Sequence, residues 1–222
     1  MVIPIAILVA GLGIAVAIYF VRAEPAFLSG GVDVSKTDPV NPNSDHIAGN
    51  PGAKIMLVEY SDIDCQYCKS FQRTLAQVAA EYGPRGDVAW VYRHFPLVDI
   101  HQHAASHAEA SECVASIAGE PYFWRFIDAI HASSPDLTEF DPLGYEAIIT
   151  SLGIDMSAFN ACMAADTFTD KVSKDFEDAL EIGANGTPFT VILVDGKEPL
   201  SISGAVSYAS LKEIIDAALA QP

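Results

Sequence analysis

The sequence has few basic residues, few cysteines and no internal repeat. Its 222 residues include 12 Lys and Arg against 29 Asp and Glu, which gives a formal net charge of −17. A charge of this sign repels nucleic-acid phosphates, so the chain is not expected to bind nucleic acid. Four cysteines are too few for a small disulfide scaffold, and no glycine-rich nucleotide loop is present. With 50% hydrophobic and 18% charged residues, the composition predicts one folded domain and a small remainder.

The longest uncharged run lies at the N-terminus. No charged side chain occurs from Val2 to Val21, and a run of this length matches a hydrocarbon core of about 30 Å. We expect residues 1–22 to form a transmembrane anchor, because the apolar part of a cleavable signal peptide is only about 7–15 residues long. Cleavage after Ala23 is the alternative. Arg22 follows the run, which by the positive-inside rule favours a cytoplasmic domain.

The next segments predict the start of an α/β domain. Residues 23–49 are rich in Pro, Gly and Asn without apolar periodicity, so they are expected to form a flexible linker. Two apolar runs typical of buried strands, Ile55–Val58 and Val88–Tyr92, flank a helical pattern that ends at Gly83. Residues 50–100 are therefore expected to form the first part of the core, a β-α-β unit.

The second half of the chain predicts helices followed by a hairpin. Residues 101–182 show only helical patterns and are expected to form a helical insert. Residues 183–222 are expected to complete the core with two strands joined at Asp195–Gly196 and a last helix capped by Ser207. The clearest stripe in the insert, ending at Gly183, consists of Phe168, Val172, Phe176 and Leu180.

The segment Cys65–Cys68 carries the predicted chemistry. It stands where the first strand ends and a helix begins, and a helix N-terminus stabilises a thiolate at Cys65 through its partial positive charge. Cys68 follows three residues later on the same face, so it can resolve a mixed disulfide formed at Cys65. A zinc site is the weaker alternative because there is no second such pair, and a purely structural disulfide would stabilise little with so short a loop.

Two further features favour a redox site. Glu59 ends an apolar strand, where a buried carboxylate is costly unless it is paired or functional. We interpret it as the group that relays the Cys68 proton, the alternative being a solvent-facing carboxylate at a sheet edge. Thr187 and Pro188 precede the third strand, and a cis proline there would expose the Thr187 backbone to an extended substrate. An ordinary trans proline is the alternative.

Three segments in this order resemble the membrane-anchored bacterial branch of the DsbA-like thioredoxin-fold thiol:disulfide oxidoreductases: Val58–Cys68, Tyr92–Leu97 and Asn185–Pro188. The likeness covers about Gly49 to the C-terminus. It implies an α/β thioredoxin fold (β-α-β plus β-β-α) with an inserted all-helical domain, preceded here by the N-terminal membrane helix.

The resemblance also implies roles for individual residues. Cys65 would be the exposed nucleophile, Cys68 the resolving thiol, Glu59 a buried acid and Pro188 a cis proline. The domain would lie outside the cytoplasm. We assign substrate binding to Gln66, Tyr67, Thr187 and Pro188.

One departure from the family concerns the strength of the oxidant. Strongly oxidising members carry a histidine between the cysteines where this chain has Tyr67, and Asp62 and Asp64 place like charge near a Cys65 thiolate. We therefore expect the pKa of Cys65 to be higher, and the disulfide to be less oxidising, than in the strongest oxidants.

The remaining cysteines and histidines receive structural interpretations. Cys113 and Cys162 are expected to form a disulfide, which an oxidising compartment permits and which could contribute roughly 4 kcal/mol. Two unpaired buried thiols are the alternative. No metal site is predicted, because the candidate ligands lack a clear fourth member and a solvated helix start explains them. Those candidates are His101, His103, His107 and Glu109, and His94 is expected to pack at a strand end.

The sequence thus predicts a single-pass membrane enzyme that introduces disulfides into exported proteins on the extracytoplasmic side. The Cys65–Cys68 disulfide is its expected redox group, without a metal or organic cofactor. The expected partners are exported proteins with reduced cysteines and a quinone-linked membrane protein that reoxidises the pair. The chain is expected to be a monomer. The alternatives are a reductase or isomerase of the same compartment, and a non-catalytic chaperone or peptide-binding module.

Overall fold

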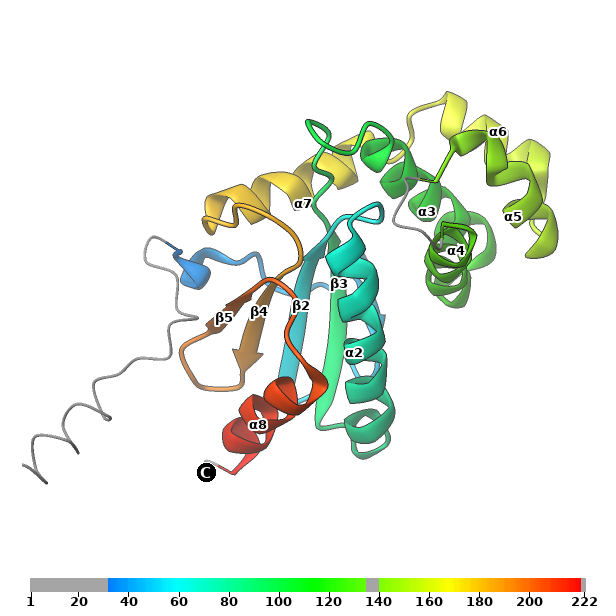
Figure 1. The fold of residues 1–222 in the computed structure, drawn as a ribbon. Helices are drawn as coiled ribbons and strands as arrows, with labels where there is room; N and C mark the ends of the chain where they lie inside the picture. Colours follow the sequence, from blue (N-terminus) through cyan, green and yellow to red (C-terminus); the bar gives the residue numbers. More distant parts are fainter. Residues whose placement is uncertain (1–31, 135–139, 221–222) are drawn as a thin grey trace, which may run out of the picture. The chain divides into compact units, whose positions relative to one another are not determined.

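A computed structural model describes residues 32–134 and 140–220. Its five-stranded sheet has the order β1-β3-β2-β4-β5, with β2 (Ile55–Ser61) at the centre (Figure 1). β2 runs parallel to β3 (Val88–His94), and the other neighbouring strands are antiparallel. Helix α2 (Gln66–Tyr82) connects β2 to β3. The predicted β-α-β unit is therefore present.

Both faces of the central strands are covered. Ile55 and Leu57 of β2 pack on the same face as α2 and α8 (Tyr208–Leu219), whereas Met56 and Val58 pack on the opposite face with α7 (Thr169–Glu181). All seven residues of β2 are buried as a result. Burial on both faces explains why the strand is a continuous apolar run rather than an alternating one.

The described elements between β3 and β4 are helical. Those before α7 gather beyond the β3 side of the sheet, whereas α7 packs on one face of it (Figure 1). A hairpin of β4 (Phe189–Val194) and β5 (Leu200–Ser203) follows, and the Ser207 hydroxyl caps α8 by accepting from the Ser210 N–H. This is the mixed α/β thioredoxin-like fold that the sequence predicts. The helical elements are α3 (Ala104–Ala118), α4 (Glu120–Ser133), η3 (Pro142–Gly144), α5 (Tyr145–Ser151), α6 (Met156–Ala164) and α7.

Residues 23–49 were predicted to form a flexible linker, but their described part, residues 32–49, is folded. It contains a short 3-10 turn, η1 (Val34–Lys36), and a strand, β1 (His46–Ala48), that pairs antiparallel with β3. Arg93 of β3 holds the segment by donating from Nε and Nη2 to the two carboxylate oxygens of Asp45, both at 3.0 Å. A segment held by polar contacts needs no apolar periodicity, so its sequence pattern did not reveal that it is folded.

Helix α7 buries the predicted stripe except at its last position: Val172 is buried and Phe176 packs against the core, whereas Leu180 does not. Leu180 is 53% exposed, whereas Asp175 and Asp178 are buried. Asp178 accepts from Arg93 Nη1 at 2.7 Å and Asp175 accepts from the His94 backbone N–H at 3.1 Å. The C-terminal end of β3 offers these two donors to the helix, so aspartates are buried beside the apolar residues of α7.

The predicted anchor, residues 1–22, lies outside the described residues. Within 32–134 and 140–220, no helix combines the length and the apolar character that spanning a bilayer requires.

Candidate functional site

The Cys65–Cys68 motif stands at the N-terminus of α2, directly after β2. The Cys65 N–H donates to the Asp62 carbonyl at 3.1 Å, and the Cys65 carbonyl accepts a helical hydrogen bond from Lys69 at 3.0 Å. Cys65 is therefore the N-cap of the helix. At this position the free amide hydrogens and the positive end of the helix dipole act on its sulfur. Both cysteines are free thiols.

The two thiols titrate in opposite directions. A hydrogen bond from the Cys68 thiol, helped by the backbone amides of Cys68 and Tyr67, lowers the pKa of Cys65 to about 6 despite the opposing effect of burial. Burial raises the pKa of Cys68 well above its ordinary value, and the neighbouring Cys65 adds to this effect. At neutral pH the pair therefore consists of a Cys65 thiolate and a protonated Cys68.

Cys65 is more enclosed than the exposed nucleophile that the family resemblance implied. It is 6% exposed, and Cys68 is fully buried. The carbonyl oxygen of Thr187 lies 3.6 Å from the Cys65 sulfur, which places the loop before β4 against the nucleophile. The Thr187–Pro188 peptide bond is cis. Between the cysteines, Gln66 and Tyr67 are exposed, and Tyr67 presents 60% of its surface to solvent.

Glu59 lies in the central strand β2 and is fully buried, so the alternative of a solvent-facing carboxylate is wrong. Its oxygens accept from the Ser61 hydroxyl at 3.1 Å and from Trp90 Nε1 at 2.9 Å. Burial raises the pKa of Glu59 to about 8 although these two hydrogen bonds lower it. A carboxyl group with this pKa is largely protonated at neutral pH and can exchange its proton there.

Ser61 connects Glu59 to the buried thiol. Its hydroxyl contacts Glu59, and it also lowers the pKa of Cys68, whereas the charge of Glu59 raises that pKa. The role of Ser61 was not predicted from the sequence. Its position two residues after Glu59 was the available signal, because alternate residues of a strand face the same side of the sheet.

The carboxylates of Asp62 and Asp64 are each paired with a histidine. His101 Nδ1 lies 2.8 Å from Asp62, and His107 Nδ1 lies 2.9 Å from Asp64. Burial disfavours the charge of His101, but the hydrogen bond and charge of Asp62 raise its pKa overall. The pair of His101 with Asp62 thus favours a positive charge beside a carboxylate that was expected to act on Cys65. Sequence reasoning missed both pairs because the partners are 39 and 43 residues apart.

The histidines once considered as metal ligands therefore have other partners. His103 contacts the Gln102 amide, and Glu109 accepts from the Thr169 hydroxyl at 3.0 Å. Together with His101 and His107, these side chains do not converge on a common metal position within the described part of the chain.

A disulfide joins Cys113 in α3 to Cys162 in α6, with the two Cα atoms 5.9 Å apart. It lies in the helical stretch between β3 and β4 and ties the start of that stretch to its later part. Its cysteines are thus separate from the free pair at the N-terminus of α2.

Comparisons with known proteins support the same fold. A family model described as thioredoxin matches residues 41–217. DsbA2 from Pseudomonas aeruginosa is 24% identical, with a TM-score of 0.68 over 81% of this chain and 96% of that one. BdbD from Bacillus subtilis is 24% identical, with a TM-score of 0.67 over 87% of this chain and 98% of that one. At this level of identity the likeness concerns the fold.

Curated relatives include proteins named as Na⁺/H⁺ antiporters. NhaA 1 from Mycolicibacterium gilvum is 33% identical over 72% of this chain and 24% of its own length, and NhaA from Herminiimonas arsenicoxydans is 30% identical over 81% and 26%. The chain therefore spans about a quarter of the length of these relatives.

Proposed function

The chain belongs to the thioredoxin family and has the DsbA-like form of the fold, and from this we propose that it is an extracytoplasmic enzyme that introduces disulfides into exported proteins. The observation that carries the proposal is the Cys65 thiolate at a helix N-terminus beside the buried, protonated Cys68. Stabilising the thiolate stabilises the reduced form, so the oxidised pair is a good electron acceptor. We assign the two-electron chemistry to this pair alone.

The proposed cycle starts from the Cys65–Cys68 disulfide. A substrate thiolate attacks the Cys65 sulfur, which forms a mixed disulfide and releases the Cys68 thiolate. A second substrate thiolate then attacks the substrate sulfur of the mixed disulfide and releases Cys65 as a stable thiolate. The substrate is oxidised by two electrons to a disulfide, and the enzyme holds those electrons as a dithiol.

Glu59 supplies the proton that this cycle needs inside the protein. When Cys68 leaves, its thiolate is buried, which is unfavourable without a proton. Glu59 has a pKa of about 8 and shares the Ser61 hydroxyl with the Cys68 site, so it can protonate the leaving sulfur. In the reverse step, reoxidation, Glu59 takes the proton back.

We place the substrate along the loop before β4 and the first turn of α2. The Thr187 carbonyl borders the Cys65 sulfur, so an extended peptide that hydrogen-bonds to this backbone would bring its cysteine to the reactive atom. Gln66, exposed Tyr67 and Pro188 would contact the flanking residues of the peptide. These groups recognise backbone and apolar surface, which fits a range of protein substrates.

The compartment and partners complete the proposal. The uncharged run at residues 1–22 would anchor the chain, with residues 32–220 acting outside the cytoplasm as a monomer. A quinone-linked membrane protein would reoxidise the pair. For this chain we propose dithiol chemistry rather than cation exchange, because it carries the Cys65–Cys68 pair and spans only about a quarter of the antiporter-named relatives.

One observation favours a second candidate, a reductase or isomerase. The pKa of Cys65, about 6, lies closer to the value of about 7 in thioredoxin than to about 3.5 in the strongest oxidant. A weaker stabilisation of the thiolate makes the disulfide less oxidising. If the chain is a reductase or isomerase, its membrane partner would supply electrons rather than remove them.

Refolding of a reduced protein with several disulfides tests the proposal. The oxidised chain is expected to restore the activity of the test protein at a rate set by Cys65, and Cys65→Ala is expected to abolish this catalysis. Cys68→Ala, with Cys65 first converted to a mixed disulfide with glutathione, is expected to release glutathione on attack by the substrate thiolate and to accumulate a mixed disulfide with the substrate, visible by mass. The matched control is Cys113→Ala with Cys162→Ala, which is expected to retain catalysis. Suppressed aggregation without disulfide formation in Cys65→Ala would instead indicate a chaperone.

A further inference from the structure

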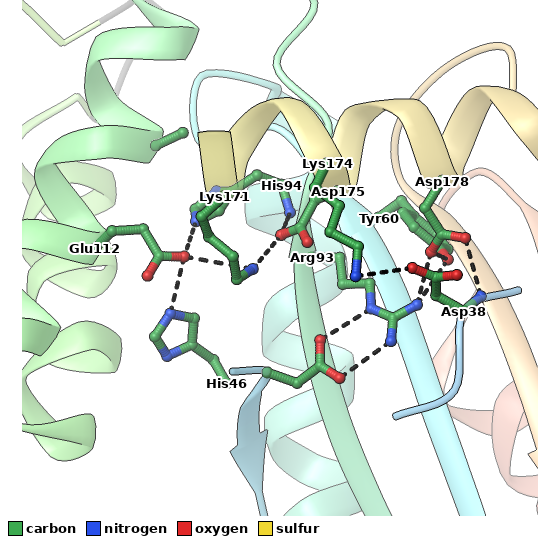
Figure 2. A network of polar contacts seen from close by, with 12 residues as sticks. Asp38, His46, Tyr60, Arg93, His94, Glu112, Lys171, Lys174, Asp175 and Asp178 are labelled. Atoms are coloured by element: carbon green, nitrogen blue, oxygen red, sulfur yellow. Dashed lines mark hydrogen bonds and ion pairs between the residues drawn. The ribbon is translucent and has the colours of Figure 1, made fainter. Parts of the chain in front are cut away.

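A second group of buried polar side chains lies where β1, β3 and α3 meet (Figure 2). His46 comes from β1, His94 ends β3 and Glu112 belongs to α3. None of them takes part in the dithiol chemistry described above. We propose that His46, His94 and Glu112 form a binding site for a zinc-class transition-metal ion that fastens β1 and β3 to α3.

The three side chains converge on one point. Oε1 of Glu112 lies 3.2 Å from His46 Nε2 and 3.1 Å from His94 Nε2 (Figure 2). All three ligand atoms lie within 4.8 Å of one another. Tetrahedral zinc with bonds of about 2.0–2.2 Å to imidazole and carboxylate sets its ligand atoms about 3.3 Å apart. The two separations from Glu112 match this spacing, and the two histidine nitrogens lie no more than 4.8 Å apart, so the histidine side chains would rotate to admit the ion.

One of these ligand atoms lacks a hydrogen bond. His46 is 6% exposed, and its buried Nε2 atom makes no well-aligned hydrogen bond among the described residues, its contact being the 3.2 Å ion pair with Glu112. A buried polar atom whose hydrogen bonding is incomplete costs free energy in a folded protein. A metal ion bound to Nε2 would use this nitrogen.

The other side of the His46 ring is fixed in the manner of a metal ligand. Its Nδ1 atom lies 2.7 Å from a carboxylate oxygen of Glu120, and its ring stacks on Phe123 with the centroids 3.5 Å apart. Metal-bound histidines usually donate their second N–H to such a carboxylate, which fixes the tautomer and the ring orientation. Glu120 thus fixes the ring so that Nε2, rather than Nδ1, faces Glu112.

A cavity of about 350 Å³ leads to the cluster and is lined by His46, Glu112 and Lys171. It reaches His46 and Glu112 from the surface, so it would give the ion an entry path and leave room for a water as fourth ligand. Lys171 Nζ lies 3.6 Å from Glu112 but 2.5 Å from Asp175, so Asp175 retains this ammonium group when Glu112 turns to the metal. Two imidazoles and one carboxylate favour zinc over Ca²⁺ and Mg²⁺, which prefer sets of oxygen ligands.

Calorimetric titration of the untagged full chain with zinc chloride tests the site. The parent protein carries Cys65→Ser and Cys68→Ser, so that the active dithiol cannot bind the metal. We expect one Zn²⁺ per chain and no binding of Ca²⁺ under the same conditions. His46→Ala and Glu112→Gln are each expected to weaken zinc binding at least about tenfold, and Glu120→Gln to weaken it about tenfold through the orientation of His46.

The matched control is His103→Ala, a histidine outside the cluster, which is expected to bind zinc as the parent does. Circular dichroism checks the fold of each variant, and His46→Gln replaces His46→Ala if the smaller side chain unfolds the protein. Absence of stoichiometric zinc binding to the parent would overturn the proposal. Binding of Ca²⁺ in place of zinc would overturn it too, as would unchanged zinc affinity in folded His46 and Glu112 variants.

Discussion

Cys65 and Cys68 differ in chemistry because they differ in depth along one helix turn. Cys65 is the N-cap and receives hydrogen bonds from Cys68 and from backbone amides, whereas Cys68 is fully buried beside Glu59. The same contact therefore lowers one pKa and raises the other. This division produces one nucleophile and one leaving group from two identical side chains.

The pH dependence of stability tests the Cys65 thiolate. Its folded pKa, about 6, lies below the ordinary thiol value of 9.0, so the thiolate stabilises the reduced protein above pH 9 and this contribution disappears as the pH falls through about 6. The free energy of unfolding of the reduced chain minus that of reduced Cys65→Ala is expected to rise by about 1.4 kcal/mol per pH unit between about pH 6 and 8. Urea unfolding measures it, and a flat difference would contradict the assignment.

Glu59 is expected to affect the pH dependence of stability in the opposite direction to the Cys65 thiolate, which Glu59→Gln tests. Burial raises the folded pKa of Glu59 to about 8 from 4.5, so its protonated form stabilises the fold at low pH and that contribution is lost as the pH rises towards 8. Between pH 5 and 8.5 the free energy of unfolding of the variant should therefore rise by roughly 4 kcal/mol relative to that of the original chain. The variant should also slow the release of Cys68 in stopped-flow measurements by at least about tenfold.

The oxidised form is the control for Glu59→Gln. In it no Cys68 thiol is present, but Glu59 remains buried, so the stability gain should persist. An unchanged rate of mixed-disulfide formation in the variant would remove Glu59 from the proton path and leave it a structural role only.

The local part of the site could be predicted from the sequence, and its long-range part could not. Cys65, Cys68 and Glu59 lie within one strand–helix unit, whose periodicity fixes their relation. The histidine partners of Asp62 and Asp64 come from a stretch 39 and 43 residues further on, and no local pattern specifies such pairs.

The segment before β2 is held by charges rather than by apolar side chains. Arg93, 3% exposed, donates to Asp45 of this segment and to Asp178 of α7 (Figure 2). The Tyr60 hydroxyl also donates to Asp178. One guanidinium group thereby joins β3, α7 and the N-terminal segment on a single face of the sheet.

Replacing Arg93 should therefore destabilise the fold strongly. Arg93→Met leaves the carboxylates of Asp45 and Asp178 buried without their cation, which typically costs about 3–5 kcal/mol. The matched control is Lys174→Met, whose exposed ion pair with Asp38 should leave the free energy of unfolding unchanged. Urea denaturation of both variants measures the difference. Equal stabilities would show that the Arg93 cluster does not hold the segment.

Strong hydrophobic periodicity predicted most elements, and its absence explains the errors. The runs at Ile55–Val58 and Val88–Tyr92 are strands in the structure. β1 has three residues and is fixed by pairing with β3, so its own sequence carries too little pattern to reveal it. In α7, paired aspartates occupy buried positions that a hydrophobicity criterion gives to apolar residues.

In the described part of the whole chain, the helical stretch between β3 and β4 supplies partners to the sheet. His101 and His107 pair with the carboxylates beside Cys65, and Glu112 reaches His46 of β1 and His94 at the C-terminal end of β3. The order of elements along the chain made the thioredoxin-like topology predictable. The chemical links between sheet and helices depend on tertiary contacts, which is why only the structure reveals them.

The equilibrium reduction potential of the Cys65–Cys68 pair is the measurement that tests the central claim most directly. The full chain would be titrated against glutathione, with the state of Cys113 and Cys162 followed by mass. We predict a value between about −120 and −180 mV, as expected for an enzyme that oxidises its substrates. A value of about −270 mV or below would contradict this account, because the pair would then donate electrons rather than accept them.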